Sequence, residues 1–235
     1  MPTTVVIGAG PGLGMSIAHR FGREGHDIAL LSRNASRHPG YLAALDAAGI
    51  KATAHQADVR DRASLLAALD AAAEHHDSVD VVYYGPGAAD PDALPAPITS
   101  TDVTSAKEAM SWIYPAIDTV GAVLPDMLER GDGGLLFAAG LSAVVPFPSL
   151  GSLAVSSAAL RNYVLTLHAG LADQGVYAGI LTIGGLIERG DIHRMMTAMP
   201  GPPPAGTLDP DALADTAWTL YSERDTPEAT FNALL

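Results

Sequence analysis

A short apolar strand that runs straight into a glycine-rich turn constrains this chain more than any other feature. The apolar, β-branched run at 4–7 predicts a strand, and Gly8, Gly12 and Gly14 follow it in G-x-x-x-G-x-G spacing. Apolar residues then recur every fourth position from Leu13, as on one face of a helix. Glycines at such a turn let the backbone approach a pyrophosphate, and the helix N-terminus offers free N–H groups to phosphates. The sequence therefore predicts a dinucleotide site directly after the first strand.

Short β-branched runs alternate with Ala/Leu-rich runs along the rest of the chain. The expected further strands are 27–31, 51–55, 79–84, 135–139 and 176–183. The expected further helices are 41–48, 62–75, one long helix capped by Asp102 and running to 130, then 153–173 and 211–222. Loops are expected at 88–97 and 201–204. This alternation predicts an α/β fold: a Rossmann-type, doubly wound parallel sheet of about seven strands with helices on both faces, in a single domain over 1–235.

Composition and charge exclude several classes of partner. The chain carries a net charge of −13, which disfavours a basic surface for nucleic acid. It has no cysteine, and its only adjacent histidines, His75 and His76, lie among polar residues, so we expect no metal site. Neither a targeting segment nor a membrane-spanning run is recognisable. We expect a cytoplasmic protein that acts on a small molecule, with no nucleic acid and no membrane as partner.

The end of the second strand indicates which dinucleotide is bound. Ser32 and Arg33 stand where a carboxylate would hold a ribose 2′-hydroxyl and repel a 2′-phosphate. A neutral serine beside an arginine favours NADP(H) over NAD(H). Asp58 and Val59, after the third strand, are placed to meet the adenine ring. The alternative is that Arg33 is an ordinary surface arginine.

Further motifs give the chain a family resemblance. Leu-Pro-Asp-Met at 124–127, Gly-Asp-Gly-Gly at 131–134, Ser-Ser-Ala-Ala-Leu at 156–160 and Ile-Gly-Gly at 183–185 stand in the order seen in classical short-chain dehydrogenases/reductases. The chain resembles that family over nearly its whole length. The resemblance implies a homodimer or homotetramer built from the helices at 103–130 and 153–173. Together with the strand and loop positions it implies these cofactor-binding residues: Gly8, Gly12, Leu13, Gly14, Ser32, Arg33, Asp58, Val59, Gly85, Gly87, Gly184 and Gly185.

When the chain is aligned with the family on Ser-Ala-Ala-Leu at 157–160, the family's catalytic residues have no counterpart. The tyrosine and lysine of Y-x-x-x-K fall on Leu153 and Ser157, the serine falls on Gly140, and the asparagine falls on Trp112. Lys51 and Lys107 are the only lysines, and no tyrosine has a lysine four or six residues later, so a shifted motif is excluded. We expect an atypical active site.

Two residues are candidates for the missing groups. Ser142 lies two residues past Gly140 and, if the chain is still extended there, points to the same side. His193 lies in an expected substrate lid at about 186–207 and has an ordinary pKa near neutrality. The alternative for His193 is a solvated side chain. Trp112 and Leu153 are expected to form a dry wall against the nicotinamide.

Two functions remain open from the sequence. The first is an NADPH-dependent reductase of a small organic substrate that works without the Tyr-Lys pair, either on an imine or iminium or on a C=O or C=C bond with Ser142, His193 or water as donor. The second is a catalytically silent or non-redox protein that binds NADP(H) or another small ligand. The retained glycine loop, Arg33 and Asp58 favour retention of the cofactor in both cases.

Overall fold

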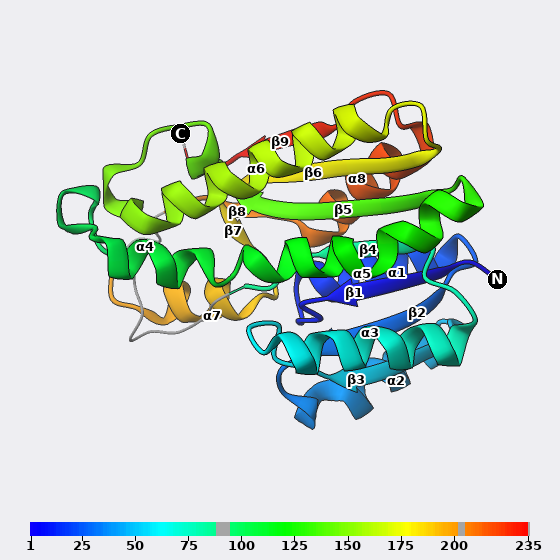
Figure 1. The fold of residues 1–235 in the computed structure, drawn as a ribbon. Coiled ribbons are helices and arrows are strands. Elements are labelled where there is room, and N and C mark those ends of the chain that lie inside the picture. The colour runs from blue at the N-terminus through cyan, green and yellow to red at the C-terminus, as the bar shows by residue number, and fades with distance from the viewer. Residues whose placement is uncertain (88–94, 202–204, 235) are drawn as a thin grey trace.

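Seven parallel strands form the central sheet of the molecule, in the order β3-β2-β1-β4-β5-β6-β9 (Figure 1). The computed structural model describes residues 1–87, 95–201 and 205–234. The strands of this sheet are β1 (Thr3–Ile7), β2 (Asp27–Ser32), β3 (Ala52–Gln56), β4 (Val81–Tyr84), β5 (Gly133–Gly140), β6 (Val176–Gly184) and β9 (Glu228–Asn232). Two short strands, β7 (Leu186–Ile187) and β8 (Thr207–Leu208), pair separately. The strand order reverses between β1 and β4, which is the crevice where doubly wound sheets bind ligands.

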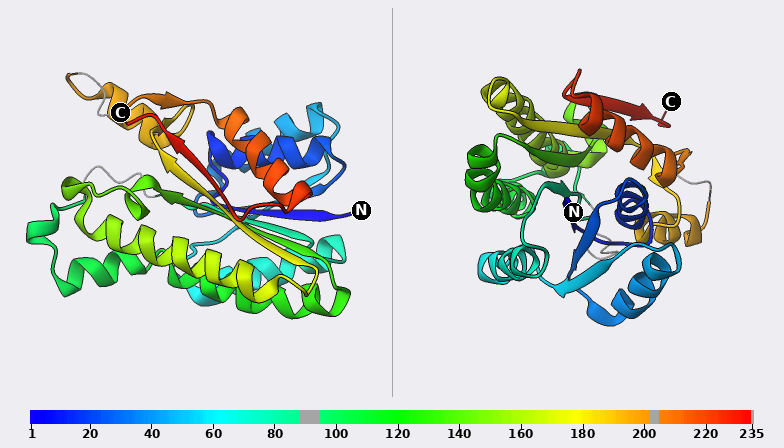
Figure 2. Two further views of the ribbon diagram at one scale, coloured as in Figure 1. Left: turned by 90° about the horizontal axis from the view of Figure 1, so that it is seen from above. Right: turned by 90° about the vertical axis from the view of Figure 1, so that its right-hand side faces the viewer.

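Helices cover both faces of the sheet, as the end-on view in Figure 2 shows. One face carries α3 (Arg62–His76), α5 (Tyr114–Arg130) and α6 (Gly151–Leu171). The other carries α1 (Leu13–Arg23), α2 (His38–Ala47) and α8 (Pro210–Glu223). The remaining helices are α4 (Val103–Met110) and α7 (Asp191–Ala198). The prediction of a Rossmann-type parallel sheet in a single domain is confirmed.

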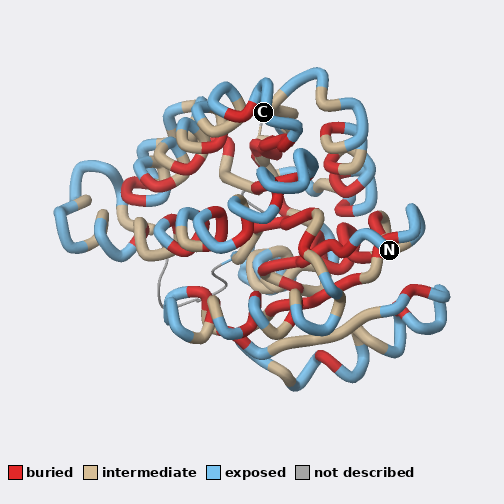
Figure 3. Tube along the Cα trace, turned by 45° about the vertical axis from the view of Figure 1, so that its right-hand side comes forward, coloured by how far each residue is buried: buried red, intermediate tan, exposed pale blue. Residues whose placement is uncertain are grey.

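Alternation along the buried strands divides the core into two layers. In β1, Val5 and Ile7 pack toward α3, α5 and α6, whereas Val6 packs toward α1 and α8. All three side chains are fully buried, because a parallel strand covered on both faces has no solvent side. Figure 3 shows the buried residues gathered in the interior of the molecule and the exposed ones on its outside. Burial of a Val or Ile side chain contributes about 1.5–3 kcal/mol.

The long helix expected over 102–130 is wrong in one respect: the chain forms two helices, α4 and α5. Asp102 caps α4 as expected, accepting the backbone N–H of Ser105 at 2.8 Å. The break follows from Ser111, whose hydroxyl donates to the Glu108 carbonyl oxygen at 2.6 Å, and from Pro115. Proline has no N–H to donate to the preceding turn, and it is tolerated in the first turn of a helix, where α5 holds it.

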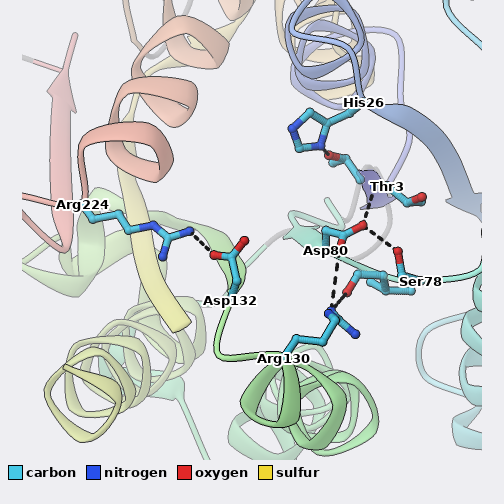
Figure 4. A network of polar contacts seen from close by, with 9 residues as sticks. Thr3, His26, Ser78, Asp80, Arg130, Asp132 and Arg224 are labelled. Carbon is cyan, nitrogen blue, oxygen red and sulfur yellow. Dashed lines mark hydrogen bonds and ion pairs between the residues drawn. The ribbon is translucent and has the colours of Figure 1, made fainter. Parts of the chain in front are cut away.

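A polar network holds the amino ends of the strands together (Figure 4). Asp80, just before β4, accepts the Thr3 N–H at 2.7 Å and the Ser78 hydroxyl at 2.8 Å. Arg130, at the end of α5, lies 3.8 Å from the Asp80 carboxylate and donates to the Val79 carbonyl oxygen at 2.9 Å. These contacts fix β1 and β4 at the end of the sheet opposite the crevice.

Two expected loops and part of the expected lid lie partly outside the described residues. Of the loop expected at 88–97 only 95–97 is described, and of that expected at 201–204 only 201. The lid segment at 186–207 contains β7, α7 and the start of β8. No helix in the described ranges has both the length and the apolar character to cross a bilayer.

Candidate functional site

The glycine turn after β1 is shaped by close backbone contacts. Gly8 has a φ of 94°, and a Cβ at this position would lie 2.7 Å from the Gly85 carbonyl oxygen. A Cβ on Gly14 would lie 2.6 Å from the Gly8 carbonyl oxygen. The N–H groups of Gly8 and Ala9 both donate to the Leu31 carbonyl oxygen at 3.0 Å. Only glycine fits at Gly8 and Gly14, so the turn lies directly against the ends of β2 and β4.

Gly12 faces the segment after β7 rather than open space. A Cβ on Gly12 would lie 3.0 Å from both the Glu188 carbonyl oxygen and the Gly190 nitrogen. Arg189 between them, with a φ of 64°, donates to the Ser16 hydroxyl of α1 at 3.1 Å and pairs with Asp211 of α8 at 2.7 Å. The lid segment is therefore anchored on α1 and α8.

A cavity of about 340 Å³ opens at the carboxyl ends of β1 and β2. Five expected cofactor residues line it: Gly8, Ser32, Arg33, Val59 and Gly87. The lining also includes residues that the sequence reasoning did not select as cofactor contacts: Ala9, Gly10, Leu31, Asn34, Arg37, Ala57, Pro86, Trp112, Asp191 and Ile192.

The other expected cofactor residues do not line this cavity. Leu13 is buried in the core beneath the turn. A Cβ on Gly85 would lie 2.2 Å from the Tyr83 hydroxyl, and one on Gly184 would lie 2.4 Å from Leu141 Cδ2. The other glycines of this set pack against the protein itself: Gly12 against 188–190, Gly14 against Gly8, and Gly185 against Leu208. The Asp58 side chain accepts a hydrogen bond from the Arg60 N–H at 3.0 Å.

Two arginines lie on one side of the cavity. Arg33 and Arg37 follow β2, and Arg37 donates from both terminal nitrogens to the two Asp191 oxygens, at 2.6 Å and 3.0 Å. The hydrogen bond to Asp191 raises the pKa of Arg37, and the hydrogen bond from Arg37 lowers the pKa of Asp191. Ser32, the neutral residue at the end of β2, has its hydroxyl 2.8 Å from His38 Nε2. This side of the cavity suits a phosphate group.

The Trp112 ring lies on the arginine side of the cavity. Its indole lies under the guanidinium groups of Arg60 and Arg33, at 4.9 Å and 5.5 Å from the ring centroid. Both arginines belong to the segments that follow β2 and β3, where the adenosine half of a dinucleotide lies in this fold. Trp112 therefore supports the arginine side of the cavity through cation–π contacts. Its contact with the nicotinamide stays a prediction.

Two serine hydroxyls converge on Gly140. The chain does not stay extended to Ser142, the condition under which this side chain is expected on the same side as Gly140, because β5 ends at Gly140 and residues Leu141–Ala143 form a 3₁₀ turn. The turn still brings Ser142 close: a Cβ on Gly140 would lie 3.3 Å from the Ser142 hydroxyl oxygen and 3.4 Å from that of Ser157. Leu153 stands one turn before Ser157 on α6, and 39% of it is exposed. The arrangement is a hydroxyl pair next to an accessible apolar side chain.

His193 lies on α7, half-buried. Its carbonyl oxygen accepts the Thr197 hydroxyl at 2.8 Å. Of the described residues of α7, Asp191 and Ile192 line the cavity and His193 does not. The described part of the chain contains no cluster of three His, Asp or Glu side chains able to hold a metal ion.

The cavity and turn fit the dinucleotide that the sequence predicts. The glycine backbone approaches the strand ends more closely than a residue with a Cβ allows, two arginines flank the end of β2, and no carboxylate stands at Ser32. Arg37 could have been found as a second arginine four residues after Arg33. Asp191 carries no comparable signal, because its partner lies 154 positions away.

Comparisons with known proteins agree with this geometry. The short chain dehydrogenase family profile matches residues 2–188. The dehydrogenase/reductase SDR family member 4 of Bos taurus is 28% identical to this chain, over 77% of the chain and 64% of that protein. The 1-deoxy-11-beta-hydroxypentalenate dehydrogenase of Streptomyces exfoliatus is also 28% identical, over 77% of the chain and 66% of that protein. The matches thus span slightly less than two thirds of these relatives.

Solved structures share the fold at lower sequence identity. A putative short-chain dehydrogenase/reductase from Burkholderia xenovorans superposes with a TM-score of 0.86 at 20% identity, covering 99% of this chain and 95% of that one. A metagenomic short-chain oxidoreductase in complex with NADP gives a TM-score of 0.80 at 18% identity, covering 100% and 98%.

Proposed function

The chain belongs to the short-chain dehydrogenase family, and from that premise we propose that it is an NADP(H)-dependent reductase of a small organic substrate that works without the family's tyrosine and lysine. Two parts of the site support the proposal. One is the arginine-rich cavity after β2, and the other is the Gly140 region, where Leu153 and two hydroxyls stand in place of a proton-donating pair.

The phosphate-binding side supports NADP(H) as the cofactor. Arg33 and Arg37 offer planar guanidinium groups that match a 2′-phosphate, and Ser32 offers a hydroxyl instead of a repelling carboxylate. The backbone of the Gly8–Gly10 turn would receive the pyrophosphate beside the N-terminus of α1. When bound, NADPH would supply the hydride.

The residues at Gly140 suit a substrate that needs no strong acid. Leu153 has no proton to give, and the hydroxyls of Ser142 and Ser157 are poor acids at neutral pH. They can orient a polar atom of the substrate, while Leu153 excludes water from one side of it. The exposed Leu153 beside this hydroxyl pair is the observation that carries the proposal.

An iminium, or an imine that solvent has already protonated, is the substrate class that fits best. A cationic C=N carbon that accepts a hydride becomes a neutral amine, so no proton has to reach an alkoxide. For a ketone or aldehyde the same step leaves an oxyanion, and Ser142, His193 or water would have to provide a proton. The site therefore favours C=N over C=O reduction.

We also propose that the chain forms a homodimer or homotetramer through α5 and α6. Exposed apolar side chains occur on α5 and α6, the two helices on which family members associate: Tyr114, Ile117, Leu128 and Val155. Burying such side chains against a second copy would remove them from water.

Isotope transfer tests the redox claim. NADPH that carries deuterium at nicotinamide C4 is incubated with the protein and a panel of cyclic imines and ketones, and the products are analysed by mass spectrometry. We expect deuterium at the former imine carbon, and slower or no labelling of ketones. If both forms of the cofactor bind without transferring label to any substrate class, the reductase proposal fails in favour of a silent, cofactor-binding protein.

A further inference from the structure

The Arg37–Asp191 ion pair joins two segments that face each other across the cofactor cavity. Arg37 ends the short turn that leads from β2 into α2, and Asp191 is the first residue of α7 in the lid segment. Figure 1 shows α7 at the same end of the molecule as α4, beyond the carboxyl ends of the strands. Both residues line the cavity, so the pair bridges its arginine side to the lid.

The pair is well aligned but accessible to solvent. Its two hydrogen bonds, at 2.6 Å and 3.0 Å, occupy both terminal nitrogens of Arg37, and the two side chains are 47% and 39% exposed. Ion pairs at this exposure contribute little net stability. A ligand that offers Arg37 a better anion can therefore displace Asp191.

Asp191 has a second partner that remains when Arg37 leaves. Arg194, three residues later on the same helix, donates to Asp191 Oδ1 at 2.5 Å, the same oxygen that accepts from Arg37. The carboxylate also lies at the N-terminus of α7, where a negative charge is favourable. Opening the bridge thus leaves no unpaired charge on the lid.

A 2′-phosphate is the anion that would compete at this position. Arg37 lines the cavity together with Ser32 and Arg33, the residues proposed to receive that phosphate. Two negative groups, the phosphate and the Asp191 carboxylate, cannot both stay against Arg37 without repulsion. NAD(H), which lacks the phosphate, presents no such competitor.

We propose that Arg37 is shared between Asp191 and the 2′-phosphate of NADP(H), so that binding of the phosphorylated cofactor releases α7 from the cavity wall and Asp191 tunes the preference for NADP(H) over NAD(H). The inference rests on the proposed function, because it needs a dinucleotide in this cavity. It makes Asp191 a residue that sets cofactor specificity through Arg37.

Binding of NADP⁺ and NAD⁺ to three variants tests the shared arginine. Arg37→Gln weakens NADP⁺ binding by about tenfold or more, since it removes a charge-assisted contact, and leaves NAD⁺ binding nearly unchanged. Asp191→Asn removes the competitor and tightens NADP⁺ binding by about two- to fivefold, again without an effect on NAD⁺. Asp211→Asn is the matched control, because Asp211 pairs with lid residue Arg189 at 2.7 Å but does not line the cavity. It leaves the NADP⁺/NAD⁺ ratio unchanged.

Hydrogen exchange of α7 tests the release directly. Adenosine 2′,5′-bisphosphate and adenosine 5′-monophosphate differ only in the 2′-phosphate, and neither carries a nicotinamide that could touch the lid. We expect the bisphosphate to speed exchange of the amides at 191–198, the monophosphate to have no effect, and Asp191→Asn to exchange fast with or without ligand.

The outcomes separate this inference from the proposed function. If NADP⁺ binds the wild-type protein while Asp191→Asn weakens it or leaves the NADP⁺/NAD⁺ ratio unchanged, the cofactor proposal stands and the shared arginine is overturned. Protection of α7 by the bisphosphate overturns it as well. If no adenine nucleotide binds, both proposals fall together.

Discussion

Arg161 on α6 donates two hydrogen bonds to Glu228 on β9, from Nε to Oε1 at 2.7 Å and from a terminal nitrogen to Oε2 at 2.6 Å. The Thr182 hydroxyl of β6 donates to the same Oε1 at 2.6 Å. Glu228 is therefore held by a helix and a neighbouring strand, and these contacts lower its pKa, mainly through Arg161. The pair ties the last strand of the sheet to the body of the fold.

Replacing Glu228 by Gln should destabilise the protein by about 1–3 kcal/mol, because Arg161 loses a charged partner in a partly buried site. The free energy of unfolding from urea titrations measures this loss. Asp118→Asn is the control, since its pair with Arg62 at 2.9 Å involves an arginine side chain that is 69% exposed. That change should cost less than about 0.5 kcal/mol. Equal losses in both variants would show that the Glu228 contacts stabilise the protein no more than the exposed Arg62–Asp118 pair does.

Stability should fall as the pH drops below neutrality, in part through His26. This side chain is 5% exposed, packs edge-on against Phe21 with ring centroids 5.5 Å apart, and has Nδ1 2.8 Å from the Thr4 hydroxyl. Burial lowers its pKa. A lowered histidine pKa means that the unfolded chain binds the proton first, so stability is lost as the pH falls through the unfolded value of about 6.5.

The pH slope of stability isolates the His26 contribution. Unfolding free energies at about pH 7.5 and about pH 5.5 are compared for the wild type and His26→Asn. We expect a smaller drop in the variant, whatever its absolute stability, because the titrating group is gone. An identical drop in both proteins would assign the acid sensitivity to other groups.

Gly10 offers a clean way to block the phosphate-binding turn. A Cβ at this position would meet only the Gly8 carbonyl oxygen, at 3.8 Å, so Gly10→Asp can be accommodated while it directs a carboxylate at the cavity that Gly10 lines. NADPH affinity should fall by about tenfold or more through charge repulsion. Gly10→Asn, of nearly equal size and neutral, should bind far better than Gly10→Asp in the same titration. Gly12 is less suitable, since a side chain there would press on Gly190.

The serine pair should matter modestly if it orients the substrate. Loss of one neutral hydrogen bond in Ser142→Ala or Ser157→Ala predicts a decrease in kcat/KM for an imine of about two- to tenfold. Loss of a general acid would instead cost about 100-fold or more. Steady-state kinetics distinguish the two, with Ser222→Ala on the far helix α8 as control. Leu153→Tyr should not raise imine turnover; a large gain would show that the family's acid is needed after all.

The elements that could be predicted from the sequence are those whose signal is local. Strands such as β1 and β6 carry runs of buried apolar residues, and the glycine turn needs its spacing whatever surrounds it. β9 was missed because Glu-Ala-Thr-Phe-Asn carries only two apolar residues, Ala229 and Phe231, which is a weak signal although both pack against the core. Its charged first residue is satisfied by Arg161, 67 positions earlier, and no local pattern records such a partner.

In the candidate site, too, the residues that could be predicted are those with a local sequence signal. Ser32 ends β2, Arg33 follows it, and Val59 lies shortly after β3, so all three line the cavity as the topology requires. Asp191 reaches it only because the lid folds back over the sheet. Ser142 meets Gly140 through a 3₁₀ turn and not through the extended strand that sequence spacing favours.

The most direct test of the account is a calorimetric titration of the wild-type protein with NADPH and with NADH, followed in the same sample by absorbance at the reduced nicotinamide band as cyclic imines and ketones are added. The account predicts tighter binding of NADPH than of NADH, then oxidation of NADPH that depends on the imine. Equal binding of both cofactors, or no binding of either, would contradict the role of Arg33 and Arg37, and ketone-dependent oxidation alone would contradict the substrate class.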